Sequence, residues 1–246
     1  MVNLWFARKG EIFEEAEGPS FYDSLQEDWY SELEREKASI SVESIKLINE
    51  LHNFIPYFED DLQQPSNSWK TLGLLRWGIA DKDKLDFVPK LKSYLQNHPE
   101  IVGCFISKIE PNAKIIEHSG TTNANYRCHL GLIVPSEDPN LLGIHVKSET
   151  LAWSEQKLLT FIDANKHYAW NKTEQERYVL IFDVIRPAFL SKKDFILSRI
   201  LVMMTFAIFA NKSNMKFLYS TPNFALNLLA HLLIPASKIL LSLKRV

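Results

Sequence analysis

The spacing of hydrophobic residues changes along the chain, from helical in the first hundred residues to strand-like in the middle. Residues 21–33 combine aromatic and apolar positions with mixed charges, which favours a first helix. Residues 42–54 carry an apolar stripe at helical spacing, which predicts a second helix with Ser41 as its N-cap. A short third helix is predicted over 87–97. Pro99 ends it, because proline disfavours helical backbone in the residue before it.

Short apolar runs separated by turn-rich segments follow from residue 101 onward. Helices that precede many strands, without alternation of strand and helix, argue against a parallel doubly wound sheet. The predicted fold class is mainly β with flanking helices: a double-stranded β-helix (jelly roll) core, N-terminal helices packed on it, and apolar C-terminal helices. Strands are predicted over 69–77, 102–109, 113–117, 126–134, 142–146, 157–162 and 177–185.

Alternation of side chains along a strand separates the residues of the 126–134 run into two groups. Arg127, His129 and Gly131 share one face, whereas the residues between them are apolar and share the other. This is the pattern of a strand that packs on one side and lines a polar site on the other. A single histidine in such a strand is more often a hydrogen-bonded core residue than a ligand.

Polar residues on neighbouring predicted strands weaken that interpretation of His129. Ser107 lies in the middle of one strand, and Arg177 opens another whose remaining positions are almost all apolar. A buried guanidinium needs an anion, so Arg177 points to an anionic ligand between the strands.

Several motifs that include these residues occur in a fixed order, and through them the chain resembles the aspartyl/asparaginyl β-hydroxylase family of Fe(II)/2-oxoglutarate dioxygenases. The resemblance covers residues 20–190, and the paired motifs are far more specific than any one of them. The matching residues are His118-x-Gly120-x-Thr122-Asn123, Arg127-x-His129-Leu130-Gly131-Leu132, Glu149-Thr150, Trp153, His167, Trp170, Arg177, Asp183-Val184 and Pro187.

The resemblance implies an iron site held by two histidines. His129 and His167 would be the protein ligands of Fe(II), a metal that imidazoles suit. The wider dioxygenase superfamily has an acidic ligand two residues after the first histidine, where this chain has Gly131. The family itself carries glycine there, with water completing the metal sphere, so Gly131 agrees with the resemblance.

The resemblance also implies how a co-substrate is bound. Arg177 would pair with the distal carboxylate of 2-oxoglutarate, helped by the hydroxyl of Ser107. Arg127 and His118 match family positions near the other end of 2-oxoglutarate and the substrate. With O2 as the third component, the implied reaction is oxidative decarboxylation of 2-oxoglutarate coupled to hydroxylation of an unactivated C–H bond.

Several substrates are compatible with that reaction. The first expectation is β-hydroxylation of Asp or Asn side chains in a peptide or protein. The alternative is hydroxylation of a lipid acyl chain, as in lipid A, or of a free amino acid. A non-catalytic binding module on the same fold is a further alternative, which the intact His129, His167 and Arg177 disfavour. No nucleic-acid partner is expected, because the chain has neither a phosphate-binding glycine loop nor basic and aromatic residues interleaved on its body.

Charge divides the chain into two parts. Residues 191–246 carry eight Lys/Arg and one acidic residue, which leaves a net charge of −9 on residues 1–190. We therefore expect a jelly-roll dioxygenase domain with its N-terminal helices over 1–190, followed by a basic, apolar helical tail over 191–246.

The tail contains two apolar stretches, 195–210 and 224–243, and Pro235 breaks the second. Because neither is a clean uninterrupted run, they predict amphipathic helices on an anionic membrane surface rather than a membrane span. The same helices could instead pack on the catalytic domain or on a second subunit, and the oligomeric state stays open.

The two cysteines, Cys104 and Cys128, lie within apolar strand-like runs, which predicts buried reduced thiols rather than a disulfide. Residues 1–18 form an irregular arm that does not resemble a secretory signal. Both observations favour the cytoplasm, and the basic tail adds a peripheral position on the inner face of a membrane.

Overall fold

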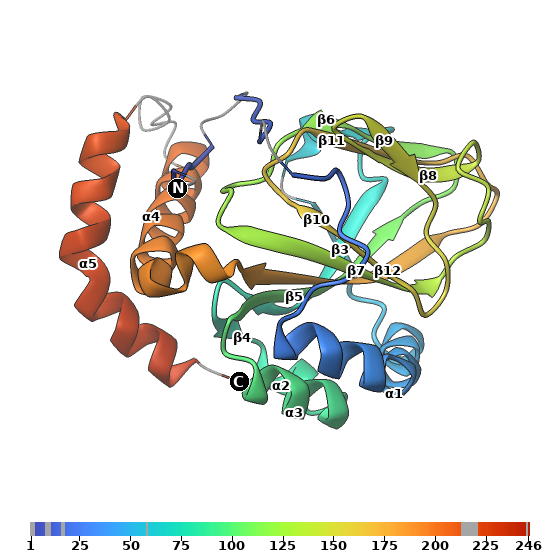
Figure 1. Cartoon of the computed structure of the whole chain (residues 1–246), viewed down its shortest axis with the longest axis horizontal. Coiled ribbons are helices and arrows are strands. Elements are labelled where there is room, and N and C mark those ends of the chain that lie inside the picture. The colour runs from blue at the N-terminus through green and yellow to red at the C-terminus, as the bar shows by residue number, and fades with distance from the viewer. Residues whose placement is uncertain (1–2, 8–10, 16–17, 58, 213–220, 245) are drawn as a thin grey trace.

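The computed structural model describes residues 3–7, 11–15, 18–57, 59–212, 221–244 and 246. Two antiparallel sheets face each other, with helices against the outer face of one sheet and at one end of the sandwich (Figure 1). The larger sheet has the order β1-β3-β5-β12-β7-β10, with β4 paired to β3, and the smaller has the order β2-β6-β11-β8-β9.

The strands of the larger sheet are β1 (Ile55–Pro56), β3 (Trp69–Arg76), β4 (Ile79–Ala80), β5 (Ile101–Ile109), β7 (Asn125–Ile133), β10 (Leu158–Ile162) and β12 (Arg177–Ile185). Those of the smaller sheet are β2 (Gln63–Gln64), β6 (Ala113–His118), β8 (Leu142–Val146), β9 (Glu149–Leu151) and β11 (His167–Asn171). From β5 to β12 the chain passes back and forth between the two sheets, so the core is a double-stranded β-helix, as predicted.

Helices α1 (Asp28–Glu50) and α3 (Pro89–Asn97) cover the outer face of the larger sheet, and the short α2 (Lys82–Leu85) precedes α3. Leu33 and Leu47 of α1 pack in one cluster with Cys128 and Leu130 of β7. The apolar face predicted for this strand therefore packs on helices, which leaves the face carrying His129 to point between the sheets. Both cysteines are buried free thiols, as predicted.

The N-terminal helices differ from the prediction. One continuous helix, α1, replaces the two predicted over 21–33 and 42–54, and it ends at Glu50. Ser41 is buried in its middle and caps nothing, so the N-cap prediction was wrong. Leu33, Ile40 and Leu47 lie on one buried stripe, and packing of that stripe on the sheet carries the helix through Ser41.

The two predicted apolar helices of the tail are present as α4 (Lys193–Lys212) and α5 (Asn223–Leu243), after a 3₁₀ segment, η2 (Pro187–Lys192). Pro235 lies inside α5 and does not end it, contrary to the prediction. Ile196 and Ile200 of α4 join the core at Val102 and Ile185. Among the described helices, only α5 is long and apolar enough to cross a membrane. The division of the chain at residue 190 stays a prediction.

Candidate active site

All six residues predicted for the site lie on the inward faces of the two sheets. Arg127 lies next to the other five. They are linked by aromatic side chains into a closed ring of contacts. From Arg177, the ring passes through Trp153, His129, Phe161, His167, His118, Trp69 and Ser107 back to Arg177. These residues come from seven strands of both sheets and from the segment that follows β9.

His118 and His167 form the closest histidine pair of the ring. They are cross-strand neighbours on β6 and β11, and their ring centroids lie 4.2 Å apart. In each ring, Nδ1 donates to the carbonyl oxygen two residues earlier, of Ile116 at 2.9 Å and of Asn165 at 2.7 Å. A carbonyl can only accept, so the proton of each neutral imidazole is on Nδ1 and Nε2 keeps its lone pair.

Burial keeps both rings neutral. It lowers the pKa of His118 to about 4 and holds the pKa of His167 well below its ordinary value. A neutral imidazole whose Nδ1–H is bonded to a carbonyl is the form that binds metal ions through Nε2. The two residues therefore fit a metal such as Fe(II).

His129 is held in a different way. The indole Nε1 of Trp153, which can only donate, bonds to Nδ1 of His129 at 3.1 Å. Burial, with the nearby cations Arg127 and Arg177, lowers the pKa of His129 well below its ordinary value. The neutral ring therefore carries its proton on Nε2, and this buried nitrogen has no hydrogen-bond partner.

The hydrogen bonds of the three Nδ1 atoms decide which histidines can bind a metal through Nε2. Nε2 of His129 presents a proton, whereas a metal requires a lone pair. The geometry thus favours His118 with His167 as the metal-binding pair over the predicted pair of His129 with His167. Among the described residues, no three His, Cys, Asp or Glu side chains converge as a metal site.

Arg177 is a buried cation without a counter-ion among the described residues. Its guanidinium lies 4.5 Å from the centre of the Trp153 ring, and Nη1 donates to the carbonyl oxygen of Ser107 at 3.2 Å. Nε has no partner, and Arg177 forms no ion pair within the described part of the chain. Burial accordingly lowers the pKa of Arg177 to about 9. With Nε2 of His129, two buried donors near Trp153 lack an acceptor, which fits the carboxylate of a ligand.

The hydroxyl of Ser107 accepts a hydrogen bond from the Trp69 indole at 3.1 Å. Its own proton is therefore available for a further acceptor. Because Ser107 and Arg177 are also joined through the Ser107 carbonyl, both side groups can reach one carboxylate.

Arg127 lies next to the ring and is already neutralised. Its Nε and Nη2 donate to the Asp183 carboxylate at 2.8 and 3.0 Å, and Nη1 lies 2.5 Å from an oxygen of Asp163. Burial opposes the charge of Arg127, but the two carboxylates outweigh it and raise its pKa. The predicted role of Arg127 near the co-substrate stays a prediction, and in the structure its guanidinium binds the two acids.

Asp163 was not identified from the sequence, and it lies where a side chain at Gly120 would be. A Cβ atom added to Gly120 would be 1.9 Å from Oδ2 of Asp163. Gly120 follows His118 by two residues, which is the spacing at which the wider dioxygenases carry their acidic ligand. The carboxyl group beside Gly120 is therefore that of Asp163, from the turn between β10 and β11. No sequence motif around Asp163 predicts this position.

Comparison with known proteins shows the family of the chain. Residues 34–187 match the family described as Aspartyl/Asparaginyl beta-hydroxylase. The chain belongs to this family. The match spans strands β1 to β12 and so includes every residue of the ring.

Two relatives of the chain are named for different hydroxylation reactions. The chain is 32% identical over 191 residues to the ornithine lipid ester-linked acyl 2-hydroxylase of Rhizobium tropici, an alignment that covers 76% of this chain and 65% of that protein. It is 31% identical over 139 residues to the human aspartyl/asparaginyl beta-hydroxylase, covering 54% of this chain and 18% of that protein. The chain thus spans less than two thirds of either relative.

Among solved structures, a 2OG-Fe(II) oxygenase family oxidoreductase from Burkholderia pseudomallei aligns with a TM-score of 0.43 and 9% identity, covering 67% of this chain and 94% of that one. A Pseudomonas putida prolyl-4-hydroxylase aligns with a TM-score of 0.42 and 11% identity, covering 61% and 87%.

Gly131, two residues after His129, is closed to any side chain by the backbone. A Cβ atom there would lie 2.1 Å from the carbonyl oxygen of Ser154. Gln156 N donates to the Gly131 carbonyl oxygen at 2.9 Å, which holds the two segments together. An acidic residue at 131 therefore has no room beside His129.

We expect Gly131→Asp to destabilise the protein and not to create a third metal ligand. Displacing a backbone segment should cost about 3 kcal/mol or more of unfolding free energy, measured by urea denaturation. Gly73→Ala is the matched control, because a Cβ there meets only the end of the Arg76 side chain at 3.6 Å. A stable Gly131→Asp protein with tighter metal binding would contradict the conclusion that position 131 has no room for an acidic ligand.

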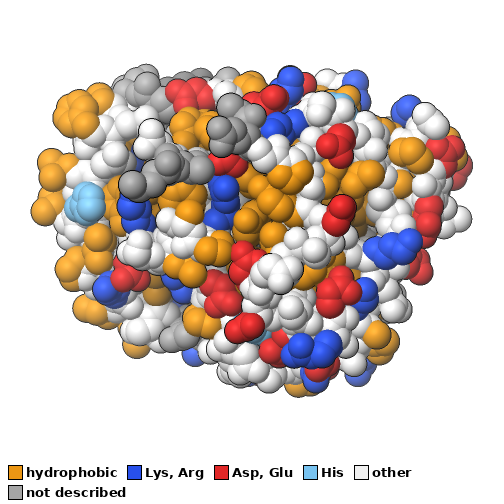
Figure 2. All heavy atoms as spheres, in the orientation of Figure 1, with side chains coloured by type: hydrophobic (Ala, Val, Ile, Leu, Met, Phe, Trp, Pro, Cys, Tyr) orange, Lys and Arg blue, Asp and Glu red, His pale blue; other side chains and the backbone are white. Residues whose placement is uncertain are grey.

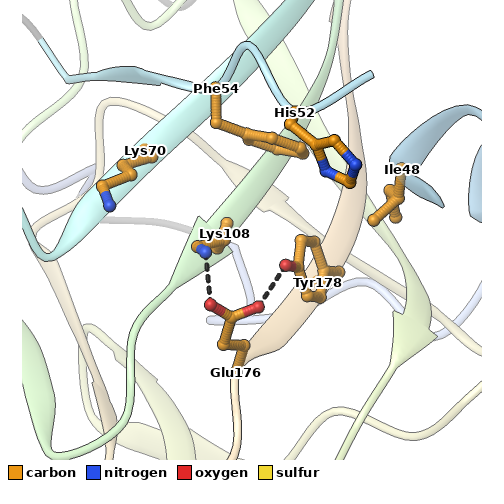
Figure 3. A pocket seen from close by; sticks show the side chains of 7 residues that line it. All are labelled: Ile48, His52, Phe54, Lys70, Lys108, Glu176 and Tyr178. Carbon is orange, nitrogen blue, oxygen red and sulfur yellow. Dashed lines mark hydrogen bonds and ion pairs between the residues drawn. The ribbon is translucent and has the colours of Figure 1, made fainter. Parts of the chain in front are cut away.

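A cavity of about 320 Å³ lies away from the ring, on the opposite face of the larger sheet (Figure 3). Lys108, which follows the inward-facing Ser107 by one residue, points into it and pairs with Glu176 and Glu110. Tyr178 donates to Glu176, so the charged groups of this cavity satisfy one another. The candidate active site is therefore the ring of contacts between the sheets.

Proposed function

We propose that the protein is an Fe(II)/2-oxoglutarate-dependent hydroxylase. His118 and His167 would hold Fe(II) through Nε2, and Arg177 with Ser107 would bind the distal carboxylate of 2-oxoglutarate. The buried guanidinium of Arg177, which forms no ion pair within the described residues, carries the proposal, because a cation in that place requires an anionic ligand. When bound, iron with 2-oxoglutarate and O2 supplies the oxidation: the co-substrate leaves as succinate and CO2, and one oxygen atom enters a C–H bond.

The residues of the chain have positioning roles in this reaction. The carbonyl oxygens of Ile116 and Asn165 orient the two metal-binding imidazoles. His129, fixed by Trp153, directs its Nε2–H towards a bound carboxylate rather than the metal. Hydroxylation of an unactivated C–H bond needs no general base, so the burial of all three histidines as neutral rings is compatible with it.

For the substrate, we infer the acyl chain of a membrane lipid. The Rhizobium relative is named for a lipid acyl 2-hydroxylase, and its alignment covers 76% of this chain, compared with 54% for the human relative. The largely exposed apolar helix α5 lies outside the family match and favours a substrate met at a bilayer. The enzyme would then act from the cytoplasm, at the inner face of a membrane. β-Hydroxylation of Asp or Asn side chains is the second candidate, which the family name favours.

The test is product analysis with the full-length protein. Supplied with Fe(II), 2-oxoglutarate and O2, it should form succinate slowly without substrate and faster with the correct substrate. Total lipid extract and a proteome digest are offered separately, and mass spectrometry follows the gain of one oxygen atom. Oxygen gained only in peptides would replace lipid by protein as the substrate. No succinate above the level of His167→Ala under any condition would favour a non-catalytic binding module.

A further inference from the structure

One face of helix α5 is buried and the other is exposed. Leu226, Ala230 and Ser237 are buried against the rest of the protein. The other side is apolar but exposed, and Figure 2 shows hydrophobic side chains gathered along the edge of the molecule where α5 lies. This outer face of α5 consists of Phe224, Leu228, Leu232, Leu233, Ile239, Leu240 and Leu243, which are half of the exposed large hydrophobic residues in the described chain.

The inner face is fixed in place by polar bonds as well as by packing. Arg199 of α4 donates from Nε to the Asn227 side chain at 2.9 Å. The hydroxyls of Ser198 and Ser237 bond at 2.7 Å. Beyond the end of α5, the Lys244 carbonyl oxygen accepts from the backbone of Ala80 in β4 at 2.8 Å. The outer face therefore has a set direction relative to the jelly roll.

A contiguous apolar face of this length is rarely left to solvent on a soluble protein. With the exposed Ala236 included, residues of this face recur at intervals of three or four along the helix, which makes a stripe from Phe224 to Leu243. Burial of such a stripe requires a partner as long as the helix.

The charges around the stripe indicate what that partner is. Helix α5 contains no acidic residue, and its Lys238 and the following Lys244 are exposed. Lys238 pairs with Asp194, the one acid of residues 191–246, so the remaining cations of this segment outnumber its acids. A second copy packed face to face on α5 would bring like charges together, whereas an anionic bilayer attracts them.

We propose that the outer face of α5 is a membrane-docking surface, and that the helix lies in the boundary between head groups and acyl chains of an anionic bilayer. Polar bonds hold the inner face on the protein, so the helix lies along the surface and does not cross it. The inference deepens the proposed function and rests on it for the reason to meet a bilayer, which is access to a lipid acyl chain.

Vesicle co-sedimentation of the full-length protein tests this surface. Vesicles of phosphatidylcholine alone are compared with vesicles that also contain phosphatidylglycerol. The double variant Leu228→Glu/Leu232→Glu changes two side chains that are 60% and 68% exposed, so the fold is retained. Val42→Glu/Phe87→Glu is the matched control, because these residues are 67% and 50% exposed and belong to α1 and to the segment between α2 and α3.

We expect wild type and control to bind the anionic vesicles, and the α5 variant to bind at least about tenfold more weakly. Equal binding of all three proteins, or none by wild type, would overturn the proposal. So would a wild-type dimer in light scattering that the α5 variant alone dissociates, because a second copy would then cover the face. Succinate formation without substrate is measured on the same samples. Its loss with docking intact would count against the proposed function only.

Discussion

Replacing Arg177 with methionine should stabilise the ligand-free protein and abolish its response to 2-oxoglutarate. The guanidinium is buried without a counter-ion among the described residues, so its removal relieves a desolvation cost. We expect a gain on the order of 1–3 kcal/mol in the free energy of unfolding, because well-packed apolar residues often replace buried charges favourably. The measurement is urea unfolding of both proteins with and without 2-oxoglutarate and Mn(II).

Arg127 provides the control, because it is also largely buried but is paired with Asp163 and Asp183. Arg127→Met leaves two buried carboxylates without their cation and should lose about 3–5 kcal/mol. The two substitutions thus have opposite expected signs. A destabilising Arg177→Met, or an Arg177→Met protein that 2-oxoglutarate still stabilises, would remove Arg177 from the anion site.

Replacing the three histidines of the ring one at a time should affect metal binding and 2-oxoglutarate binding differently. His118→Ala and His167→Ala should each weaken Mn(II) or Fe(II) binding by more than about a hundredfold, because each removes one of two protein ligands. His129→Gln should retain the metal and bind 2-oxoglutarate more weakly. Calorimetric titration with Mn(II), with and without 2-oxoglutarate, measures both effects.

His145→Ala is the control for this series. Its ring nitrogens are bonded to Thr150 and to the Lys147 carbonyl, outside the ring of contacts, so metal binding should not change. Loss of the metal in His129→Gln together with its retention in His118→Ala would restore the ligand pair implied by the sequence resemblance.

The long strands could be predicted from the sequence because their signal is local, whereas the short β11, which carries His167, was not predicted. Strands β5, β7 and β12 are long apolar runs, and the predicted bounds differ from the observed ones by at most one residue. Alternation along β7 placed His129 on the inward face correctly. Ser41 shows where local reasoning ends: a good capping residue lies inside a helix because a buried stripe continues on both sides of it.

The candidate site was predictable as a set of residues but not as a set of roles. Whether a histidine offers a lone pair depends on the partner of its other nitrogen. For His129 that partner is Trp153, 24 positions away. Asp163 reaches the position of the missing side chain at Gly120 from a turn, so no motif around His118 contains it. Cross-strand register and side-chain hydrogen bonds decide these roles, and neither is a property of one segment.

The ring of contacts has a consequence for how the protein folds. Its eight side chains lie between Trp69 and Arg177, and consecutive members of the ring are mostly far apart in sequence. His118 and His167 meet within the smaller sheet, and Arg177 and Ser107 meet within the larger one, so only the two sheets together complete the ring. Long-range closures of this kind form late, after the loop entropy of many connections has been lost. During synthesis β12 is the last strand to be made, so the proposed anion site of Arg177 and Ser107 should form only when β12 pairs between β5 and β7.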